Sequence, residues 1–558
     1  MRSSLQAARF RGEMRVADGA APRAPNRGPS GFSVATSVAA LCLTLGLGAT
    51  VFGCSLTNVS RSDCTSDNDC AAAFGPGSKC SAGFCSDPKG CTTGHDCRQI
   101  QGGGACVEGA CVAQFPVDAQ CNLAAAPPEP PDLFSKPLVG DDAPLVIGSI
   151  FALESAREVK LTQAVRLAVQ EINQAGLDGG QKLGVVFCDN GGAKNETEGA
   201  AREELNQHAV DYLAGTLGVP YLVGPLTSSD AIALVNRMLK QAYPTVIISP
   251  SATSPGLTTN TDRLDPKDPY GLFWRTCPSD EFQGAVLAKN VISEDKTILR
   301  VTVIYVDDPY GQGLRQVFQK AWPGGVTAVD LFPYTAATLN DPVKLAKLID
   351  DADAANGDAV LIIAHQSGTE DSAARKILDA MGGKTIATKR FFFTDGTKSK
   401  ESLFKAPIPD FVQTILQGAM GTAPASPSGQ DYDIFDTNLF ASFGLHASDE
   451  SFLAQSYDAA YIGAFGVAHA VKKKSAFTGL DVAEGLSKLS AGTQVHLNGV
   501  NAWTSGKGLI VQEGQIDVEG ASGPLDFDAS TGEAPGPIEV WGVAADLSDF
   551  TQIKIVPP

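Results

Sequence analysis

The feature of this sequence that most constrains its fold is a repeated order of short apolar runs and amphipathic stretches that begins near residue 144. Residues 145–150 form an apolar run typical of a buried strand, and the next such run covers residues 183–187. Between them, apolar residues recur with the spacing of one helical face. Strand, helix and strand in that order predict a parallel sheet with helices on both faces. Because the pattern occupies more than 400 residues, we expect two such α/β lobes. Further strand patterns lie at residues 221–223, 245–248, 301–306, 359–364 and 390–394.

Two turn-rich segments follow neighbouring strand patterns. Residues 223–230, Val-Gly-Pro-Leu-Thr-Ser-Ser-Asp, and residues 248–255, Ile-Ser-Pro-Ser-Ala-Thr-Ser-Pro, place hydroxyls and backbone N–H groups at two strand ends. Ser228 or Ser229 is expected to cap the helix that follows the first segment. Free N–H groups at a helix start bind carboxylates or phosphates. The pair therefore predicts an anion site, and ordinary turn and cap chemistry is the alternative.

The charge balance limits the classes of partner. The 558 residues include 62 acidic and 43 basic side chains, which gives a formal net charge of −19. Nucleic acid binding needs a basic patch to neutralise phosphates, so this balance argues against it. A hydrophobic content of 43% is that of a globular protein.

The N-terminal region predicts export. An arginine-rich start is followed by residues 32–52, which carry no charge, and by Gly53-Cys54. A basic region, an apolar region and small residues at a cleavage site are typical of a signal peptide. Gly53-Cys54 resembles a bacterial lipobox, which makes residues 1–53 the signal and Cys54 the lipid-modified residue. A retained membrane-spanning anchor is the alternative, because 21 uncharged residues can cross a bilayer.

A cysteine-rich segment follows, within residues 54–121. It is an internal repeat of about 27 residues, and each copy holds four cysteines. Each copy is too poor in apolar residues for a core, so we expect two disulfides per copy, with the connectivity open. Zinc is the rival interpretation, but paired C-x-x-C elements are absent from the repeat. Residues 54–121 and the Pro-rich linker at 122–143 are expected to form a spacer between membrane and working domain. The repeat cysteines are Cys64, Cys70, Cys80 and Cys85, then Cys91, Cys97, Cys106 and Cys111.

The order of short motifs in residues 144–558 resembles the type I periplasmic solute-binding proteins of the leucine/isoleucine/valine-binding family. Ten motifs carry the resemblance, among them the two turn segments described above. The others are Ile147-Gly-Ser, Glu171-Ile-Asn, Phe273-Trp-Arg-Thr, Pro278-Ser-Asp280, Asp308-Pro-Tyr-Gly311, Asp395-Gly396, Tyr457-Asp-Ala-Ala460 and Gly523-Pro-Leu-Asp-Phe527.

The resemblance implies two doubly wound lobes that close on a ligand by bending at a hinge. It places lobe 1 at about residues 144–277 and 424–521, and lobe 2 at about residues 278–423 and 522–558. The chain is then expected to cross between the lobes near residues 276–279, 421–426 and 522–527. Residues 494–519 exceed the family pattern and are expected to be an elaboration at a lobe edge.

The resemblance also implies site residues. The ligand carboxylate is expected at Ser228, with Ser229 beside it, and the second turn segment contributes Ser251 and Thr253. From lobe 2, Tyr310 and Asp395 match the aromatic and acidic positions, and Asp395 is expected to receive an ammonium group. Turn chemistry is the alternative for each of these residues.

Two positions depart from the family pattern. Arg157 stands where the family places a tyrosine in the first loop, and His365 or Gln366 falls where it places a second one. These replacements favour a more polar or acidic ligand than leucine, although a solvated Arg157 is the alternative. Cys188 and Cys277 are expected to be separate buried thiols, because the strand order 2-1-3-4-5 places them at opposite edges of the sheet.

These observations predict a membrane-anchored, extracytoplasmic solute-binding protein for an amino acid or similar small zwitterion, without a cofactor or metal, that delivers its ligand to an ABC permease. A ligand-sensing receptor that signals to a protein partner is the second hypothesis. An enzyme is not predicted, because the six histidines form no HExxH pair and no GxSxG serine or phosphate-binding loop is present.

Overall fold

The structure is a computed structural model that describes residues 64–74, 78–81, 84–86, 90–121, 135–191, 199–259, 261–364, 372–425 and 428–558. The predicted signal peptide and the lipobox Cys54 lie outside these residues. Across the described ranges, no helix combines the length and the apolar character needed to cross a bilayer.

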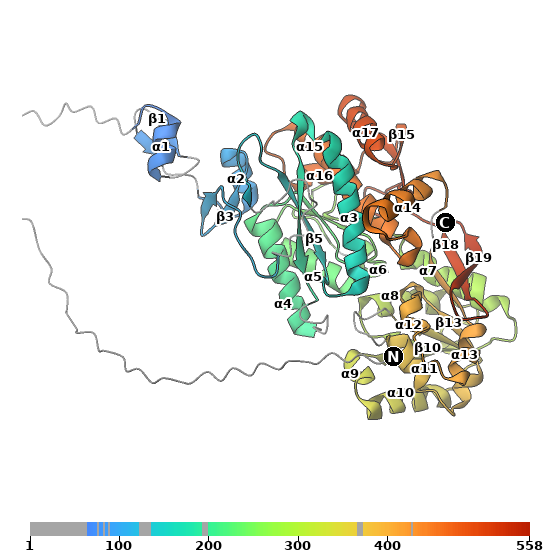
Figure 1. The fold of residues 1–558 in the computed structure, drawn as a ribbon. Helices are drawn as coiled ribbons and strands as arrows, with labels where there is room; N and C mark the ends of the chain where they lie inside the picture. The colour runs from blue at the N-terminus through green and yellow to red at the C-terminus, as the bar shows by residue number, and fades with distance from the viewer. Residues whose placement is uncertain are drawn as a thin grey trace, which may run out of the picture. The chain divides into compact units, whose positions relative to one another are not determined.

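Lobe 1 is built on a five-stranded parallel sheet in the order β6-β5-β7-β8-β9. This is the order 2-1-3-4-5 expected from the sequence. Helices α3 and α15 cover one face and helices α4 and α5 cover the other, each over its own apolar core (Figure 1). The strands are β5 (Leu145–Phe151), β6 (Leu183–Asp189), β7 (Tyr221–Val223), β8 (Val246–Ser249) and β9 (Phe273–Arg275), and the helices are α3 (Ala156–Ala175), α4 (Gly199–Val210), α5 (Ser228–Gln241), α6 (Pro255–Thr259), α14 (Gln430–Phe443), α15 (Leu453–Lys473) and α16 (Gly479–Leu486).

Lobe 2 is built on a seven-stranded sheet in the order β11-β10-β12-β13-β14-β18-β19. The first five strands are parallel to one another, β18 is antiparallel to β14, and β19 is antiparallel to β18. Helices again cover both faces, so the prediction of two doubly wound lobes is confirmed. The strands are β10 (Val301–Val306), β11 (Val329–Tyr334), β12 (Ala359–Ile363), β13 (Arg390–Phe393), β14 (Met420–Pro424), β18 (Ile538–Val543) and β19 (Phe550–Val556), and the helices are α7 (Asp280–Val286), α8 (Pro309–Ala321), α9 (Ala336–Leu339), α10 (Pro342–Ala354), α11 (Ala373–Asp379), α12 (Lys400–Leu403) and α13 (Asp410–Gln417).

The chain crosses between the lobes three times. The first crossing joins β9 to α7, and the second joins β14 to α14. The third crossing lies further along the chain than the 522–527 expected from sequence. Leu525, Phe527 and Ala534 all belong to the core of lobe 1, and β18 begins only at Ile538. The apolar side chains after residue 522 therefore hold this stretch on lobe 1.

The elaboration at residues 494–519 forms part of lobe 1. Strands β15 (Thr493–His496), β16 (Ile516–Gly520) and β17 (Gly523–Pro524) form a small sheet, and α17 (Val500–Glu513) lies against α3 and α15. Trp503 stacks on Phe465 and donates its indole N–H to the carbonyl of Gly176. This segment extends the core on the α15 face of the sheet.

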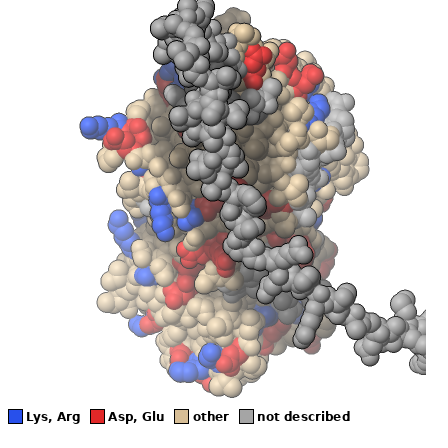
Figure 2. Space-filling view, turned by 90° about the vertical axis from the view of Figure 1, so that its left-hand side faces the viewer, with Lys and Arg blue, Asp and Glu red and all other residues tan. Residues whose placement is uncertain are grey.

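Acidic and basic side chains are mixed on the face of the molecule in Figure 2. The excess negative charge is therefore not gathered into a single block on this face.

Both cysteine copies contain a helix followed by a hairpin: α1 (Asp67–Phe74) with β1 (Lys79–Ser81) and β2 (Phe84–Ser86), and α2 (Gly94–Gln101) with β3 (Ala105–Val107) and β4 (Ala110–Val112). In the second copy, disulfides join Cys91 to Cys106 and Cys97 to Cys111. In the first copy, Cys64 is joined to Cys80, and Cys70 is also disulfide-bonded. The first cysteine is thus joined to the third in each copy.

The second copy is packed on lobe 1 and is not a free spacer. Buried His95 lies 3.1 Å from the hydroxyl of Thr245, and Arg98 donates to the carbonyls of Gly218 (2.8 Å) and Phe477 (3.0 Å). A side chain on Gly94 would lie 2.4 Å from the backbone of Leu217. The first copy has Asp67, Asn68 and Ala71 in place of Gly94, His95 and Arg98, so it lacks these contacts.

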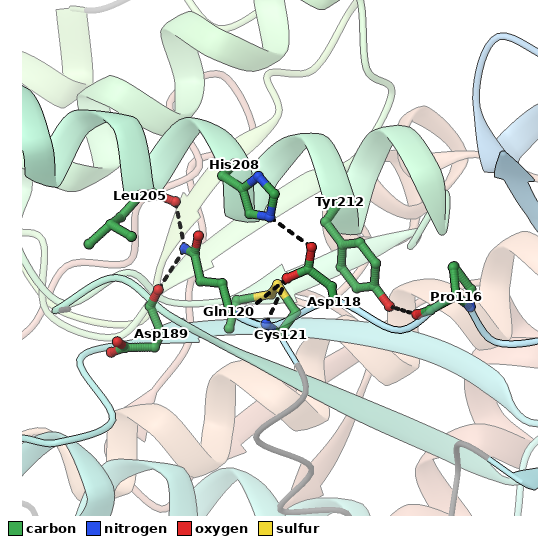
Figure 3. Close-up of a disulfide and its surroundings, with 9 residues drawn as sticks. Pro116, Asp118, Gln120, Cys121, Asp189, Leu205, His208 and Tyr212 are labelled. Carbon is green, nitrogen blue, oxygen red and sulfur yellow. Dashed lines mark hydrogen bonds and ion pairs between the residues drawn. A yellow bond between two sulfur atoms is a disulfide. The ribbon is translucent and has the colours of Figure 1, made fainter. Parts of the chain in front are cut away.

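A disulfide between Cys121 and Cys188 fixes the segment that follows the second copy (Figure 3). The side chain of Gln120 lies between β6 and α4 and donates to the carbonyls of Asp189 and Leu205. The expectation that Cys188 is a free thiol was therefore wrong. Its partner comes from a segment that precedes the domain and lies along the edge strand β6. Cys277, at the opposite edge, is free and buried.

Candidate ligand-binding site

The two turn segments meet at the carboxyl ends of β7 and β8. The hydroxyl of Ser228 accepts a hydrogen bond from the backbone N–H of Ser254 over 3.1 Å. In the opposite direction, Ser251 Oγ donates to the carbonyl of Leu226 over 2.6 Å. Strand ends that are adjacent in a parallel sheet form the ligand-binding edge of α/β proteins. The hydroxyls predicted to converge are therefore within one hydrogen-bonded pair of loops.

The cap of α5 differs from the prediction. Thr227 is the capping residue, and its hydroxyl accepts the N–H of Asp230. Ser228 is consequently the first helical residue, which frees its hydroxyl to contact the second loop. The turn itself requires glycine at residue 224, where φ is +105° and a Cβ would lie 2.3 Å from the carbonyl oxygen of Ile150.

Arg275 holds the second loop in place. This arginine is fully buried at the end of β9, and it donates to the carbonyls of Ala252 (2.9 Å) and Ser254 (3.1 Å). It also pairs with Glu533, which lies just before the third crossing between the lobes. Arg275 thus fixes the residues on either side of Thr253. The motif Phe273-Trp-Arg-Thr was recognised in the sequence, but its arginine was not assigned this role.

On lobe 2, Tyr310 and Asp395 lie together as expected. The hydroxyl of Tyr310 is 2.8 Å from Asp395 Oδ1 and 2.8 Å from the hydroxyl of Thr394. The amide of Gln283 donates to the same carboxylate oxygen over 2.8 Å. Burial raises the pKa of Asp395, and the hydrogen bonds from Tyr310 and Gln283 oppose that rise.

A second buried carboxyl lies close to Asp395. The hydroxyl of Thr253 donates to Asp280 Oδ2 over 2.7 Å, whereas Asp280 Oδ1 has no hydrogen-bond partner in the described part of the chain. Burial and the charge of Asp395 raise the pKa of Asp280 well above its usual value. The two carboxyl groups therefore form an acidic pair that a positively charged group would stabilise.

The lobes are also in direct contact beside these residues. Ser229 Oγ donates to Asp308 Oδ2 over 3.2 Å, and Ser254 Oγ donates to the carbonyl of Pro309 over 2.8 Å. Asp308 caps α8 through the N–H of Gly311. Ser229, predicted as a ligand residue, therefore bridges the lobes in this structure.

Arg157 is not a solvated surface side chain, which was the alternative to a role at the ligand. Its Nε donates to Glu450 Oε1 over 2.9 Å, and the two side chains are only 11% and 4% exposed. Arg157 lies in the first turn of α3, after the carboxyl end of β5. Its charge also lowers the pKa of Asp395 on the other lobe. His365 and Gln366 lie outside the described residues.

A small cavity of about 40 Å³ opens beside Asp395. Lys398 borders it from lobe 2, and Glu450, Tyr432 and Phe452 border it from lobe 1. Phe452 has a φ of +71°, a conformation that is costly for an aromatic residue and often marks functional positions. None of these four residues was predicted from the sequence, because Lys398, Glu450 and Phe452 lie in irregular segments that no strand or helix pattern places, and Tyr432 lies near the start of α14 with no motif to mark it.

Residues 160–546 match the model of the receptor family ligand binding region. The chain belongs to this family. This match, with the relatives and the solved structure described below, confirms the predicted likeness to type I periplasmic binding proteins, and these matches are binding proteins and not enzymes.

Two curated proteins are similar to this ligand-binding family member in sequence. The Leu/Ile/Val-binding protein homolog 3 of Brucella melitensis is 27% identical over 255 residues, which cover 44% of the chain and 61% of the relative. The chemotactic signal transduction system substrate-binding protein BasB of Halobacterium salinarum is 28% identical over 227 residues, which cover 39% of the chain and 50% of the relative. The chain thus spans about half to three fifths of the length of these relatives.

The fold of this family member is that of solved substrate-binding proteins. The branched-chain amino acid transporter substrate-binding protein LivJ of Streptococcus pneumoniae, in complex with isoleucine, superposes with a TM-score of 0.53 at 20% identity. The superposition covers 74% of the chain and 99% of LivJ. At this identity the likeness establishes the fold.

Proposed function

We propose that this protein is an extracytoplasmic solute-binding protein that holds an amino acid or similar small zwitterion between its two lobes. The observation that carries the proposal is the arrangement of a hydroxyl-rich loop pair on lobe 1 opposite Tyr310 and Asp395 on lobe 2. A carboxylate group is matched by the first arrangement and an ammonium group by the second.

Each candidate residue has a role in this proposal. The ligand carboxylate binds at Ser228 and at the start of α5, beside Ser251 and Thr253. The ligand ammonium binds Asp395, with Tyr310 fixing the carboxylate and Asp280 adding a second negative group. Ser229 and Asp308 join the lobes once the ligand is enclosed. Closure of the lobes is then the event that a membrane partner recognises.

The setting of the protein is also part of the proposal. Residues 1–53 direct export, Cys54 carries the lipid anchor, and an ABC permease receives the ligand. The disulfides support an oxidising compartment. The second cysteine copy acts with lobe 1 as one unit, so the tether from the membrane leads to the first copy.

A ligand-sensing receptor is the second candidate. The specific observation in its favour is the match to a chemotactic substrate-binding protein at an identity similar to that of the Leu/Ile/Val-binding homologue. Both candidates use the same site and differ in the partner that recognises the closed form.

A thermal-shift screen of the purified full-length chain against the amino acids, with benzoate and succinate as non-zwitterionic comparisons, tests the proposal. A ligand present at a hundredfold excess over its Kd stabilises the folded form by about 2.7 kcal/mol. We expect at least one amino acid to raise the melting temperature and Asp395→Ala to abolish the shift. A shift with benzoate or succinate alone, or with no compound, rejects the proposed ligand class.

A further inference from the structure

The geometry points to an anion-accepting subsite next to Asp395, and we infer that the ligand is an amino acid with an acidic side chain. The inference rests on the proposed function, because it takes the positions of the ligand ammonium and α-carboxylate from that proposal. It adds the chemistry of the third ligand group, which the proposed function leaves open.

Arg157 supplies the first spare hydrogen-bond donors of this subsite. A guanidinium group carries five N–H donors, and Arg157 uses only its Nε, toward Glu450. Its two terminal nitrogens form no hydrogen bond with any residue in the described ranges. The side chain is 11% exposed, and its partner Glu450 borders the cavity beside Asp395, so this group lies next to the cavity. A planar fork of unused donors suits a carboxylate.

Lys398 supplies further donors from the other lobe. It follows Asp395 by one short helical turn, η9 (Asp395–Thr397), and it borders the 40 Å³ cavity. The Lys398 ammonium group donates one of its three N–H bonds to Glu539. The side chain is 16% exposed, so its head is largely desolvated. Lys398 thus borders the cavity directly and Arg157 lies one residue away, through Glu450, and both are partly desolvated cations with unused donors.

Two carboxylate oxygens around this region already accept two hydrogen bonds each. Glu450 Oε1 accepts from Arg157 and from the N–H of Ser451. Asp395 Oδ1 accepts from Tyr310 and Gln283. Asp280 Oδ1 is a buried carboxylate oxygen without a hydrogen-bond partner among the described residues, and it lies with Asp395 on the side assigned to the ammonium group. The site thus offers an unused buried carboxylate oxygen for the ammonium group and, beside Asp395, unused donors on Arg157 and Lys398 for a second carboxylate.

Two other ligand chemistries fit less well. An aliphatic side chain such as that of leucine would leave Arg157 and Lys398 facing apolar atoms, which costs free energy because charged donors lose water without a partner. A bound metal ion needs several converging ligand atoms. Outside the cysteine modules, no three His, Cys, Asp or Glu ligand atoms in the described residues lie within 4.8 Å of one another.

Titration calorimetry of the full-length chain with L-glutamate, L-aspartate, L-glutamine, L-asparagine and L-leucine tests the inference. We expect an acidic amino acid to bind about ten- to hundredfold more tightly than its amide, the usual worth of a charged hydrogen bond. This comparison needs no variant. If an amide or leucine binds as tightly as the acids, the inference is wrong and the proposed function stands. If no amino acid binds, both are wrong.

A double variant, Arg157→Gln with Glu450→Gln, removes the ion pair without leaving one charge buried alone. We expect the preference for the acid over its amide to fall to within about threefold, while binding of the amide persists. The matched control is Arg237→Gln with Asp211→Asn, an ion pair of lobe 1 on α5 and the segment before β7. If the preference for the acid over its amide survives in the Arg157→Gln, Glu450→Gln variant, or is lost in the control, the inference is wrong.

Discussion

Ser229 of lobe 1 and Asp308 of lobe 2 form a hydrogen bond of 3.2 Å across the cleft. Ser229 lies in the first turn of α5, and Asp308 precedes α8, so both ends of the bond are fixed by helix starts. The bond therefore links the orientation of one lobe directly to that of the other, beside the residues assigned to the ligand.

Replacing Ser229 by alanine is expected to favour separation of the lobes. The loss of a hydrogen bond of this kind costs about 1 kcal/mol, which lowers the population of the closed form about fivefold relative to the open form. Small-angle scattering without ligand will report a larger radius of gyration than for the unmodified protein. Thr504→Ala, on the exposed side of α17, is the control. Equal radii for all three proteins would contradict the role of this contact.

As the pH is lowered, ligand affinity is expected to start to fall at a pH higher than the usual pKa of an aspartate. The folded pKa of Asp395 is raised by burial, and an ammonium group binds the ionised carboxylate. Affinity is therefore complete above the raised pKa and falls by about tenfold per pH unit below it. Calorimetry from pH 7.5 down to pH 5, with the amino acid that gives the largest thermal shift, measures this dependence. Asp395→Asn should bind weakly and with a smaller pH dependence, because Asp280, whose pKa is also raised, remains, and an equal pH dependence in the two proteins would contradict Asp395 as the ammonium site.

Removal of the Cys121–Cys188 disulfide is expected to destabilise lobe 1. The two residues are 67 positions apart, and closing a loop of that length in the unfolded chain is worth about 4 kcal/mol. Cys121→Ser with Cys188→Ser should lower the melting temperature and expose residues 113–121 to protease. Cys277→Ala, which removes the free buried thiol, tests for a general effect of losing a cysteine. An unchanged melting temperature in the double variant would show that the hydrogen bonds of Gln120 alone hold this segment.

Gly94→Ala is expected to detach the second cysteine copy from lobe 1. The added Cβ would lie 2.4 Å from the backbone of Leu217 and 2.5 Å from that of Gly218, and backbone cannot move aside cheaply. Hydrogen exchange should increase for the backbone amides of α2, while the internal disulfides of the copy remain. Gly90→Ala, where the nearest atom is 3.4 Å away, is the matched control. Equal exchange in the two variants would mean that the copy is not held by this contact.

The sequence by itself determined the lobes and the place of the candidate site residues at strand ends. Alternating apolar and amphipathic patterns identify the strands and helices of both sheets, because each pattern reports the periodicity of burial along one element. The motifs around Ser228, Thr253, Tyr310 and Asp395 follow directly from strand ends. In a parallel sheet, strand order brings such ends to one edge, so the sequence alone places these residues together.

Tertiary structure decided what depends on contacts between distant segments. The pairing of Cys121 with Cys188, the docking of Gly94 and Arg98, and the ion pair between Arg157 and Glu450 each join residues from different elements. No local pattern carries this information, because the free energy of such contacts comes from packing and from charge pairing in three dimensions. The same holds for Lys398 and Phe452, which lie at the cavity only because two crossings of the chain bring irregular segments beside Asp395.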